Sequence, residues 1–271
     1  MNDILYKLKR LCVKFALPLW KRKELIRYFL TTEIKLAYGD RLLGFFWAVL
    51  DPLMMMVVYT FLVVIVFDRG GPQFPILLFS ALLSWRWFTF SIIGSVKSLT
   101  GKARIIQTVS FPKATLPLTR VLLGLTNYLW GLVALTPLLF LFHARINVNI
   151  LWLPFLILVQ FMLTLGLALI LAIVGVYFRD ISNILQFTLR LWFYLSPGLY
   201  SIDSLSAFQK YITFYLIVNP FATLFESYKN ILVRGEPPNP YIWVTLAIAI
   251  GSLALGACHF ARKETTIVKE L

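Results

Sequence analysis

The chain has 271 residues, of which 59% are hydrophobic and only 14% are charged. A soluble domain of this length needs a polar surface that this composition does not supply, so a soluble globular protein is excluded. The formal net charge of +14 does not indicate a nucleic-acid-binding protein. The basic residues lie at the ends of long apolar runs, where membrane topology and anionic lipid account for them.

The first 43 residues carry ten Lys/Arg and lack an apolar core followed by a small-residue cleavage site, so a cleavable signal peptide is not expected. Residues 4–15 place apolar side chains on one helical face and basic ones on the other. A second helical stretch after Pro18 has Glu33 intruding on its apolar side, which carries Ile26, Phe29, Leu30, Ile34 and Ala37. Basic amphipathic helices lie in the membrane interface. Here they either simply anchor the chain or have a mechanical role.

Six later stretches approach or exceed the roughly 20 apolar residues that a helix needs to span the hydrocarbon core. They are Gly44–Phe67, Ile76–Val96, Val121–Phe142, Ile150–Phe178, Asn183–Leu199 and Tyr241–Ala261. The segments on one side of these spans hold 19 Lys/Arg and those on the other side hold 5. The positive-inside rule then places both termini in the cytoplasm. The sequence predicts one all-α integral membrane domain, residues 1–271, with six transmembrane helices. Cys12 and Cys258 are interpreted as free thiols.

The connection 97–120, between spans two and three, holds five basic residues and no acid. Residues Lys97–Val109 are predicted to form a short helix that ends before Phe111-Pro112, because the residue before a proline disfavours the helical region. A short cytoplasmic helix on two stiff spans suits a segment that receives a push from a soluble partner. The alternative is a loop whose basic residues only fix the topology.

The link between spans four and five is very short and contains Arg179 and Asp180. Their default interpretation is structural, because adjacent opposite charges can cap two helix ends at the lipid headgroups. The fifth span has only 17 residues and runs into Ser196-Pro197-Gly198.

Residues 205–233 are too apolar for a solvated loop, and Asn219-Pro220 divides them. Irregular backbone at membrane depth is tolerated only where it is buried in protein or lines a cavity. We therefore expect two re-entrant half-helices that enter the outer leaflet and return. Glu226 and Lys229 are spaced i,i+3 and are expected to pair on the second of them.

Three charged residues lie inside the spans, and such residues are costly enough to be candidate functional sites. Asp51 and Arg190 lie at similar depths, roughly 10–12 Å from the inner ends of their spans. We expect them to pair or to face one polar cavity. Arg86, near the middle of span two, either satisfies an interhelical contact or marks a translocation path. Aromatic residues within the spans either line a channel that stacks on sugar rings or pack the core; they include Trp47, Tyr59, Trp85, Phe88, Tyr128 and Trp192.

The reactive side chains are scattered, which argues against an enzyme. The twelve acidic residues occur singly, and His143 and His259 lie in different segments. Neither a HExxH motif nor a Gly-rich phosphate loop is present. We assign no catalytic or metal-ligating residue, and the energy for any transport must come from a partner or a gradient. A membrane enzyme of glycolipid synthesis is the alternative from a different class.

Four segments, in this order along six spans, resemble the membrane subunit of ABC exporters of the type 2 permease class. The most similar branch exports lipid-linked polysaccharide of the O-antigen type, with capsule and teichoic acid exporters as relatives. The segments are 43–52 (LGFFWAVLDP), 111–117 (FPKATLP), 177–181 (YFRDI), and 219–221 (NPF) with 226–229 (ESYK). Arg86 departs from the apolar residue expected in its neighbourhood, and Lys229 stands where arginine is commoner.

This resemblance implies a channel formed by two copies of the chain in the bacterial inner membrane. Two separate ATP-binding cassette subunits would bind ATP and magnesium, so this chain would carry no cofactor. Residues 1–43 would be the interfacial region near the substrate entrance, and 205–233 the outer gate helices. The segment 97–110 would be the coupling helix; the expected contacts with the ATP-binding subunit are Lys97, Lys102, Arg104, Ile105, Arg179 and Asp180.

The expected channel and gate residues are Trp47, Asp51, Tyr59, Trp85, Arg86, Arg190, Asn219, Pro220, Glu226 and Lys229. The implied substrate is a glycan on an undecaprenyl pyrophosphate carrier, whose pyrophosphate would meet basic residues at the inner interface. Teichoic acid, capsule, a drug or another small amphiphile remain alternative substrates of the same architecture. Membrane lipids are the remaining expected partners, and nucleic acid is not one.

Overall fold

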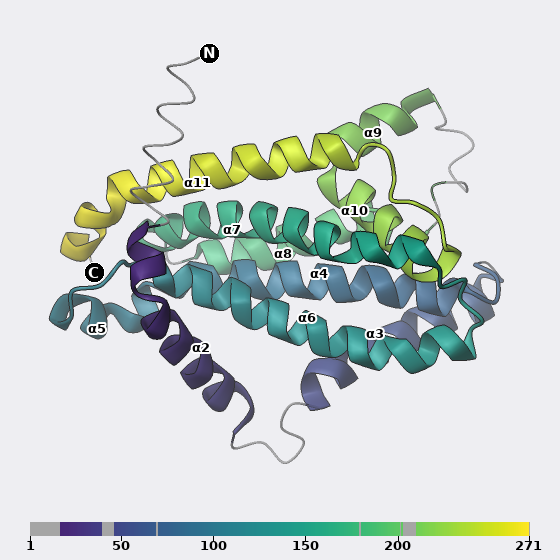
Figure 1. The fold of residues 1–271 in the computed structure, drawn as a ribbon, viewed down its shortest axis with the longest axis horizontal. Helices are drawn as coiled ribbons and strands as arrows, with labels where there is room; N and C mark the ends of the chain where they lie inside the picture. Colours follow the sequence, from purple (N-terminus) through teal and green to yellow (C-terminus); the bar gives the residue numbers. More distant parts are fainter. Residues whose placement is uncertain are drawn as a thin grey trace.

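The computed structural model describes residues 17–39, 46–68, 70–178, 180–200, 202 and 210–270, and the regular elements within these ranges are all helices (Figure 1). The long helices are α3 (Trp47–Thr60), which a π-helical segment extends to Val66, α4 (Phe74–Val96), α6 (Thr115–Leu141), α7 (Leu153–Tyr177) and α11 (Ile242–Glu270). The shorter helices are α2 (Lys23–Tyr38), α5 (Ala103–Thr108), α8 (Ile181–Leu195), α9 (Ile212–Val218) and α10 (Pro220–Lys229). The predicted all-α class is confirmed.

Five helical stretches within the described ranges are long and apolar enough to cross a membrane. They are Val49–Val66, Phe74–Val96, Thr115–Leu141, Val148–Tyr177 and Ile242–Ile267. Five of the six predicted spans therefore have counterparts, with bounds shifted by a few residues. The chain is a multi-pass membrane protein.

The predicted fifth span, Asn183–Leu199, corresponds to α8, which is shorter and begins earlier. The 15 residues of α8 extend about 22 Å, less than the roughly 30 Å of a hydrocarbon core. The helix ends at Leu195 because Ser196 precedes Pro197 and takes an extended backbone, with φ −104° and ψ 151°.

The centre of the bundle is α4. In its most apolar stretch 72% of the residues are buried, compared with 11% in the stretch that starts in α3. Gln160 of α7 anchors α4 through two 2.8 Å hydrogen bonds, because its amide donates to the Ser84 carbonyl and accepts from the Ser84 hydroxyl. Buried amide bonds of this kind fix the relative register of two apolar helices.

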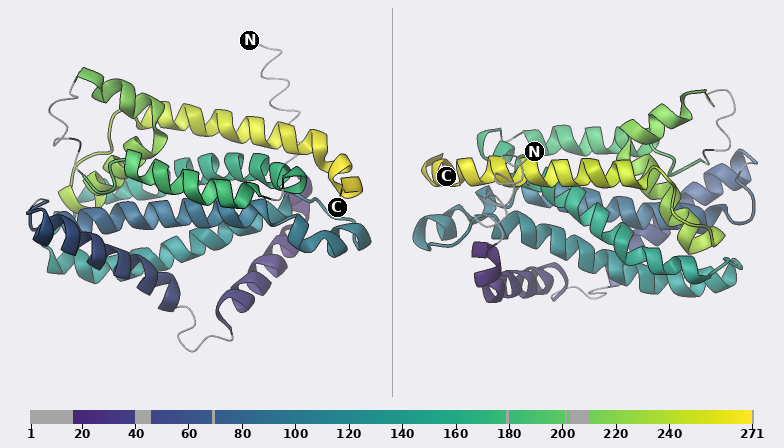
Figure 2. Two further views of the ribbon diagram at one scale, coloured as in Figure 1. Left: turned by 180° about the vertical axis from the view of Figure 1, so that it is seen from behind. Right: turned by 45° about the horizontal axis from the view of Figure 1, so that its top comes forward.

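Glycines allow α7 and α11 to pack backbone against backbone. A Cβ added at Gly256 would lie 2.3 Å from the carbonyl oxygen of Gly166, and one added at Gly166 would lie 2.4 Å from the backbone of Ser252. Small residues at such contacts let membrane helices approach closely. Figures 1 and 2 show α11 running beside α7, with α4 and α6 on the other side of α7.

The two ends of the bundle differ. One end, called the α5 end below, carries α5 and the C-terminus of the chain; the other, the α10 end, carries α9 and α10 (Figure 1). The predicted amphipathic helix of residues 4–15 lies outside the described residues. The helix predicted after Pro18 is α2, which begins at the α5 end and slants away from it on the outside of the bundle (Figures 1 and 2).

Candidate functional site

The segment predicted to couple to an ATP-binding subunit is less regular than the helix expected over 97–109. After α4 ends at Val96, a turn leads into a 3₁₀ helix at Thr100–Lys102 and then into the six residues of α5. Lys97, Arg104 and Ile105 are exposed. Three of the predicted contact residues are therefore accessible at the α5 end.

Lys102 faces the molecule instead, because Glu33 of α2 is buried beside it. One carboxylate oxygen of Glu33 lies 2.5 Å from Lys102 Nζ, and the other lies 3.1 Å from a guanidinium nitrogen of Arg120, at the start of α6. Lys102 Nζ also lies 4.8 Å from the centre of the Phe29 ring. Glu33 thus intrudes on the apolar face of α2 because it binds two basic residues. We call Glu33, Lys102 and Arg120 the Glu33 cluster.

The loop that follows α5 is also tied to the C-terminal helix. The backbone N–H of Lys113 donates to a carboxylate oxygen of Glu264 on α11, at 2.7 Å. The ring of Phe111 lies 5.7 Å from that of Phe29 on α2. The coupling segment is therefore held between α2 on one side and α11 on the other.

The link between α7 and α8 lies near the same end, since a Cβ on Gly175 would lie 2.2 Å from the carbonyl oxygen of Val96. Asp180 precedes α8 and is exposed, but its side chain makes no capping hydrogen bond. Asp180 therefore occupies the N-cap position of α8, as its expected structural role requires, but caps the helix without a side-chain hydrogen bond. Arg179 lies outside the described residues.

The charged residues within the spans pair differently from the expectation. Asp51 of α3 forms an ion pair with Arg86 of α4, not with Arg190. The reason is the helix order, since α3 packs on α4 and brings Asp51 to the nearer arginine. The side chains of Arg86 and Asp51 remain 47% and 39% exposed in the single chain, so this interhelical pair also faces open space.

Two cavities meet at Arg86. The smaller, of about 240 Å³, is lined by Trp47, Asp51, Tyr38 and Asn127 among others. The larger, of about 470 Å³, lies between α3, α4 and α8 and includes Tyr59, Trp85 and Arg190 in its lining. Six of the ten predicted channel and gate residues are thus gathered around Arg86.

The two tryptophans predicted for the channel have different surroundings. Trp85 is only 6% exposed and packs edge-to-face on Phe221 of α10, with ring centres 4.9 Å apart. Trp47 is 45% exposed. The core-packing interpretation therefore applies to Trp85, although one side of it lines the larger cavity, and Trp47 remains accessible for stacking.

Asn219 and Pro220 divide the predicted outer gate segment 205–233, called the lid below, as expected. The backbone of Asn219 is extended, and its side-chain oxygen accepts from the Phe221 N–H at 3.1 Å, which caps the start of α10. The same oxygen accepts from the indole N–H of Trp192 at 3.0 Å, and the Asn219 amide donates to Ser196 at 2.9 Å. Asn219 thereby joins the lid to α8. Residues 205–209 of the predicted lid lie outside the described residues.

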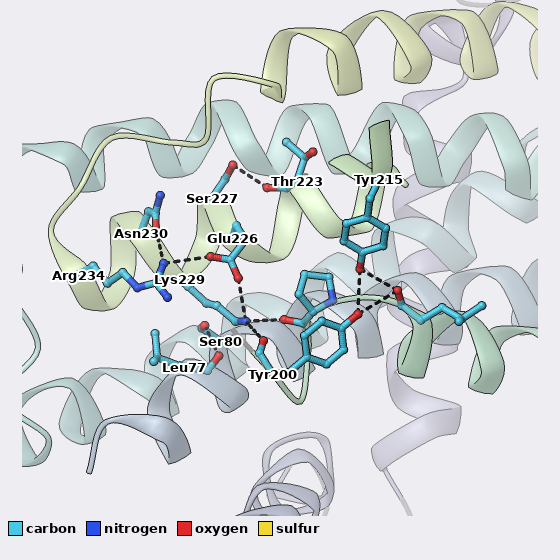
Figure 3. Close-up of polar contacts among 12 residues, drawn as sticks. Leu77, Ser80, Tyr200, Tyr215, Thr223, Glu226, Ser227, Lys229, Asn230 and Arg234 are labelled. Carbon is cyan, nitrogen blue, oxygen red and sulfur yellow. Dashed lines mark hydrogen bonds and ion pairs between the residues drawn. The ribbon is translucent and has the colours of Figure 1, made fainter. Parts of the chain in front are cut away.

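The predicted pair on α10 is confirmed and belongs to a larger buried group (Figure 3). Lys229 Nζ lies 3.1 Å from Glu226, and Arg234 lies 3.0 Å from the other carboxylate oxygen. The residues Glu226 and Lys229 are only 4% and 3% exposed. Lys229 also donates to the carbonyls of Pro197 and Tyr200, so it binds the chain that leaves α8.

Two tyrosines also join the end of α8 to α9 (Figure 3). The hydroxyls of Tyr200 and Tyr215 lie 3.1 Å apart, and Tyr215 donates to the Leu195 carbonyl at 2.7 Å. They satisfy the carbonyl that the end of α8 leaves without a helical partner.

Several residues of this site were not identified from the sequence. The sequence contains no signal for Arg120 or Arg234, because their partners lie far away in the chain or across an irregular turn. The acid on the apolar face of α2 was a usable signal, since a charge placed there needs a buried partner.

Comparison with known proteins shows the family of the chain and several relatives. The model of the family described as ABC-2 type transporter matches residues 24–233. A Myxococcus xanthus protein named O-antigen export system permease protein RfbA is 29% identical over 235 residues, covering 87% of this chain and 90% of its own length. A Klebsiella pneumoniae protein of the same name is 26% identical over 229 residues, covering 84% of this chain and 87% of its own length.

Proposed function

Because the chain belongs to the ABC-2 type transporter family, we propose that it is the membrane subunit of an ATP-driven exporter of lipid-linked polysaccharide of the O-antigen type. The observation that carries this proposal is the similarity, over most of both chains, to relatives named O-antigen export permeases. Two copies would form the channel. ATP and magnesium would bind to two separate ATP-binding cassette subunits.

The geometry supports force transfer at the α5 end. The exposed residues Arg104 and Ile105 offer a contact for a soluble subunit, and the Glu33 cluster joins this segment to α2 and α6. A push on α5 would therefore reach the interfacial helix and the third span together. We further propose that this end faces the cytoplasm, that both termini are cytoplasmic, and that the membrane is the bacterial inner membrane.

The α10 end supports a gate. In our proposal α8, together with the turn that follows it, is the fifth of six spans, and α9 and α10 are re-entrant. The buried polar contacts of Asn219 and Lys229 explain how an irregular backbone is satisfied at such a depth. The glycan on its undecaprenyl pyrophosphate carrier would pass along the face that contains Trp47 and Arg86.

Co-purification with the ATP-binding subunit, followed by ATPase assays, tests this function. We expect a stable complex whose ATP hydrolysis is stimulated by an undecaprenyl-pyrophosphate-linked glycan. Stimulation by a small amphiphile but not by the glycan would assign the other substrate class. Failure to bind any ATP-binding subunit would refute the proposal.

A further inference from the structure

The larger cavity beside Arg86 is basic. Both Arg86 and Arg190 line it, and no acidic residue is present among the described residues of its lining. Asp51 lies on the other side of Arg86, in the smaller cavity, where it pairs with that arginine. The larger cavity therefore keeps one positive charge, that of Arg190, which Asp51 does not neutralise.

Arg190 makes no ion pair with a carboxylate in the part of the chain that the structure describes. An arginine within a membrane-embedded bundle is costly unless another group compensates its charge. It is exposed on α8 beside Gln186 and Tyr194, which also line the cavity. These neighbours offer hydrogen-bonding groups without a negative charge, so the compensating anion has to come from elsewhere.

The two arginines lie at the same level of the bundle. Arg86 is about 15 Å from the end of α4 at Val96, and Arg190 is about 14 Å from the start of α8 at Ile181, at 1.5 Å per residue. Both distances are measured from the α5 end, where Val96 approaches Gly175 near the end of α7. The basic cavity is therefore close to the middle of a hydrocarbon core about 30 Å thick.

We propose that Arg190, together with Arg86 in the lining of the same cavity, forms a binding site for an oxyanion of the transported substrate. This proposal rests on the proposed function. A guanidinium group matches phosphate and carboxylate oxygens through two parallel hydrogen bonds. Two parts of a lipid-linked glycan carry such oxygens: the pyrophosphate of the carrier, and any uronic acid or phosphate substituent of the sugars. The aromatic walls at Tyr59 and Trp85 suit a sugar attached to either.

A binding experiment on the purified complex of this chain with its ATP-binding subunit, held in lipid nanodiscs, tests the site. The probes for the carrier are undecaprenyl pyrophosphate and the uncharged alcohol undecaprenol. The probes for the sugars are a glucuronate-containing oligosaccharide and a neutral one of equal length. Each affinity is measured for the wild type, Arg190→Gln and Arg190→Lys. Arg145→Gln is the matched control, since it removes the same charge from an exposed position outside the cavity.

We expect Arg190→Gln to weaken one anionic probe by about tenfold or more, which corresponds to losing a charge-assisted hydrogen bond. The two uncharged probes should bind Arg190→Gln as tightly as they bind the wild type. Arg145→Gln should bind all four probes with wild-type affinity. Weaker binding of undecaprenyl pyrophosphate assigns the carrier as the source of the anion. Weaker binding of the glucuronate oligosaccharide assigns the sugars. Arg190→Lys should show a smaller loss, because lysine keeps the charge but not the two parallel donors.

Unchanged affinity for both anionic probes in Arg190→Gln would overturn the site. If Arg190→Gln does not assemble, Arg190→Lys decides, and wild-type affinity in that variant overturns the bidentate contact. Export of polymer by the wild type is measured in parallel. If the wild type exports polymer but Arg190→Gln binds both anionic probes as the wild type does, the site alone is refuted. If anion binding depends on Arg190 but the wild type exports no polymer, the proposed function alone is refuted.

Discussion

Glu226→Gln tests whether the lid is held by a buried ion pair. The substitution keeps the size of the side chain but leaves Lys229, which is 3% exposed, without its carboxylate. Removing one partner of a buried pair costs about 3–5 kcal/mol in the free energy of unfolding. Lys229 retains the carbonyls of Pro197 and Tyr200, so we expect the lower value of about 3 kcal/mol.

The assay is thermal unfolding of the purified protein in detergent. At about 2–4 °C per kcal/mol, Glu226→Gln should lower Tm by roughly 6–12 °C. Glu236→Gln is the matched control, because Glu236 is exposed on the following loop and should change stability by less than about 0.5 kcal/mol. Lys229→Met should cost less than Glu226→Gln, since Glu226 keeps Arg234 as a partner. Equal Tm values for Glu226→Gln and Glu236→Gln would refute this reasoning.

Two other substitutions examine the bundle and the α5 end. Gly256→Ala should lower the free energy of unfolding by about 1–3 kcal/mol, because the added methyl group overpacks against α7. Gly251→Ala, where an added Cβ meets nothing within 4 Å, should be neutral or stabilising. Thermal unfolding separates the two variants, and equal Tm values would contradict the close backbone contact. Glu33→Gln should raise the amount of ATP hydrolysed per glycan exported several-fold, because it loosens α2 from Lys102. Glu24→Gln, on the exposed side of α2, should leave this ratio unchanged. An unchanged ratio in Glu33→Gln would contradict force transfer through the Glu33 cluster.

Span length, proline position and helical spacing, which depend only on neighbouring residues, predicted much of the structure. Apolar length identified five spans, and the proline after Asn219 divided the lid where the structure divides it. The i,i+3 spacing of Glu226 and Lys229 predicted their ion pair because a helix brings such residues together regardless of the rest of the fold.

Partners set by helix packing were not predictable in the same way. Equal depth in the membrane suggested Arg190 as the partner of Asp51, but depth does not say which helices are neighbours, and α3 packs on α4. The predicted fifth span also extended too far, to Leu199, because it was defined by the overall apolar composition across Ser196-Pro197. The helix α8 stops at Leu195. The side of α2 on which Glu33 lies was visible, but its two basic partners come from other elements.

Translocation in sealed vesicles tests the central claim most directly. The complex is reconstituted with its ATP-binding subunit and an undecaprenyl-pyrophosphate-linked glycan, and the glycan that reaches the opposite leaflet is measured with and without ATP. We predict ATP-dependent translocation by the wild type and its loss in Gln107→Pro, which places a proline in the interior of the six-residue α5 and breaks it while leaving the chain in the membrane. Translocation by Gln107→Pro at the wild-type rate, or by the wild type without ATP, would contradict the account.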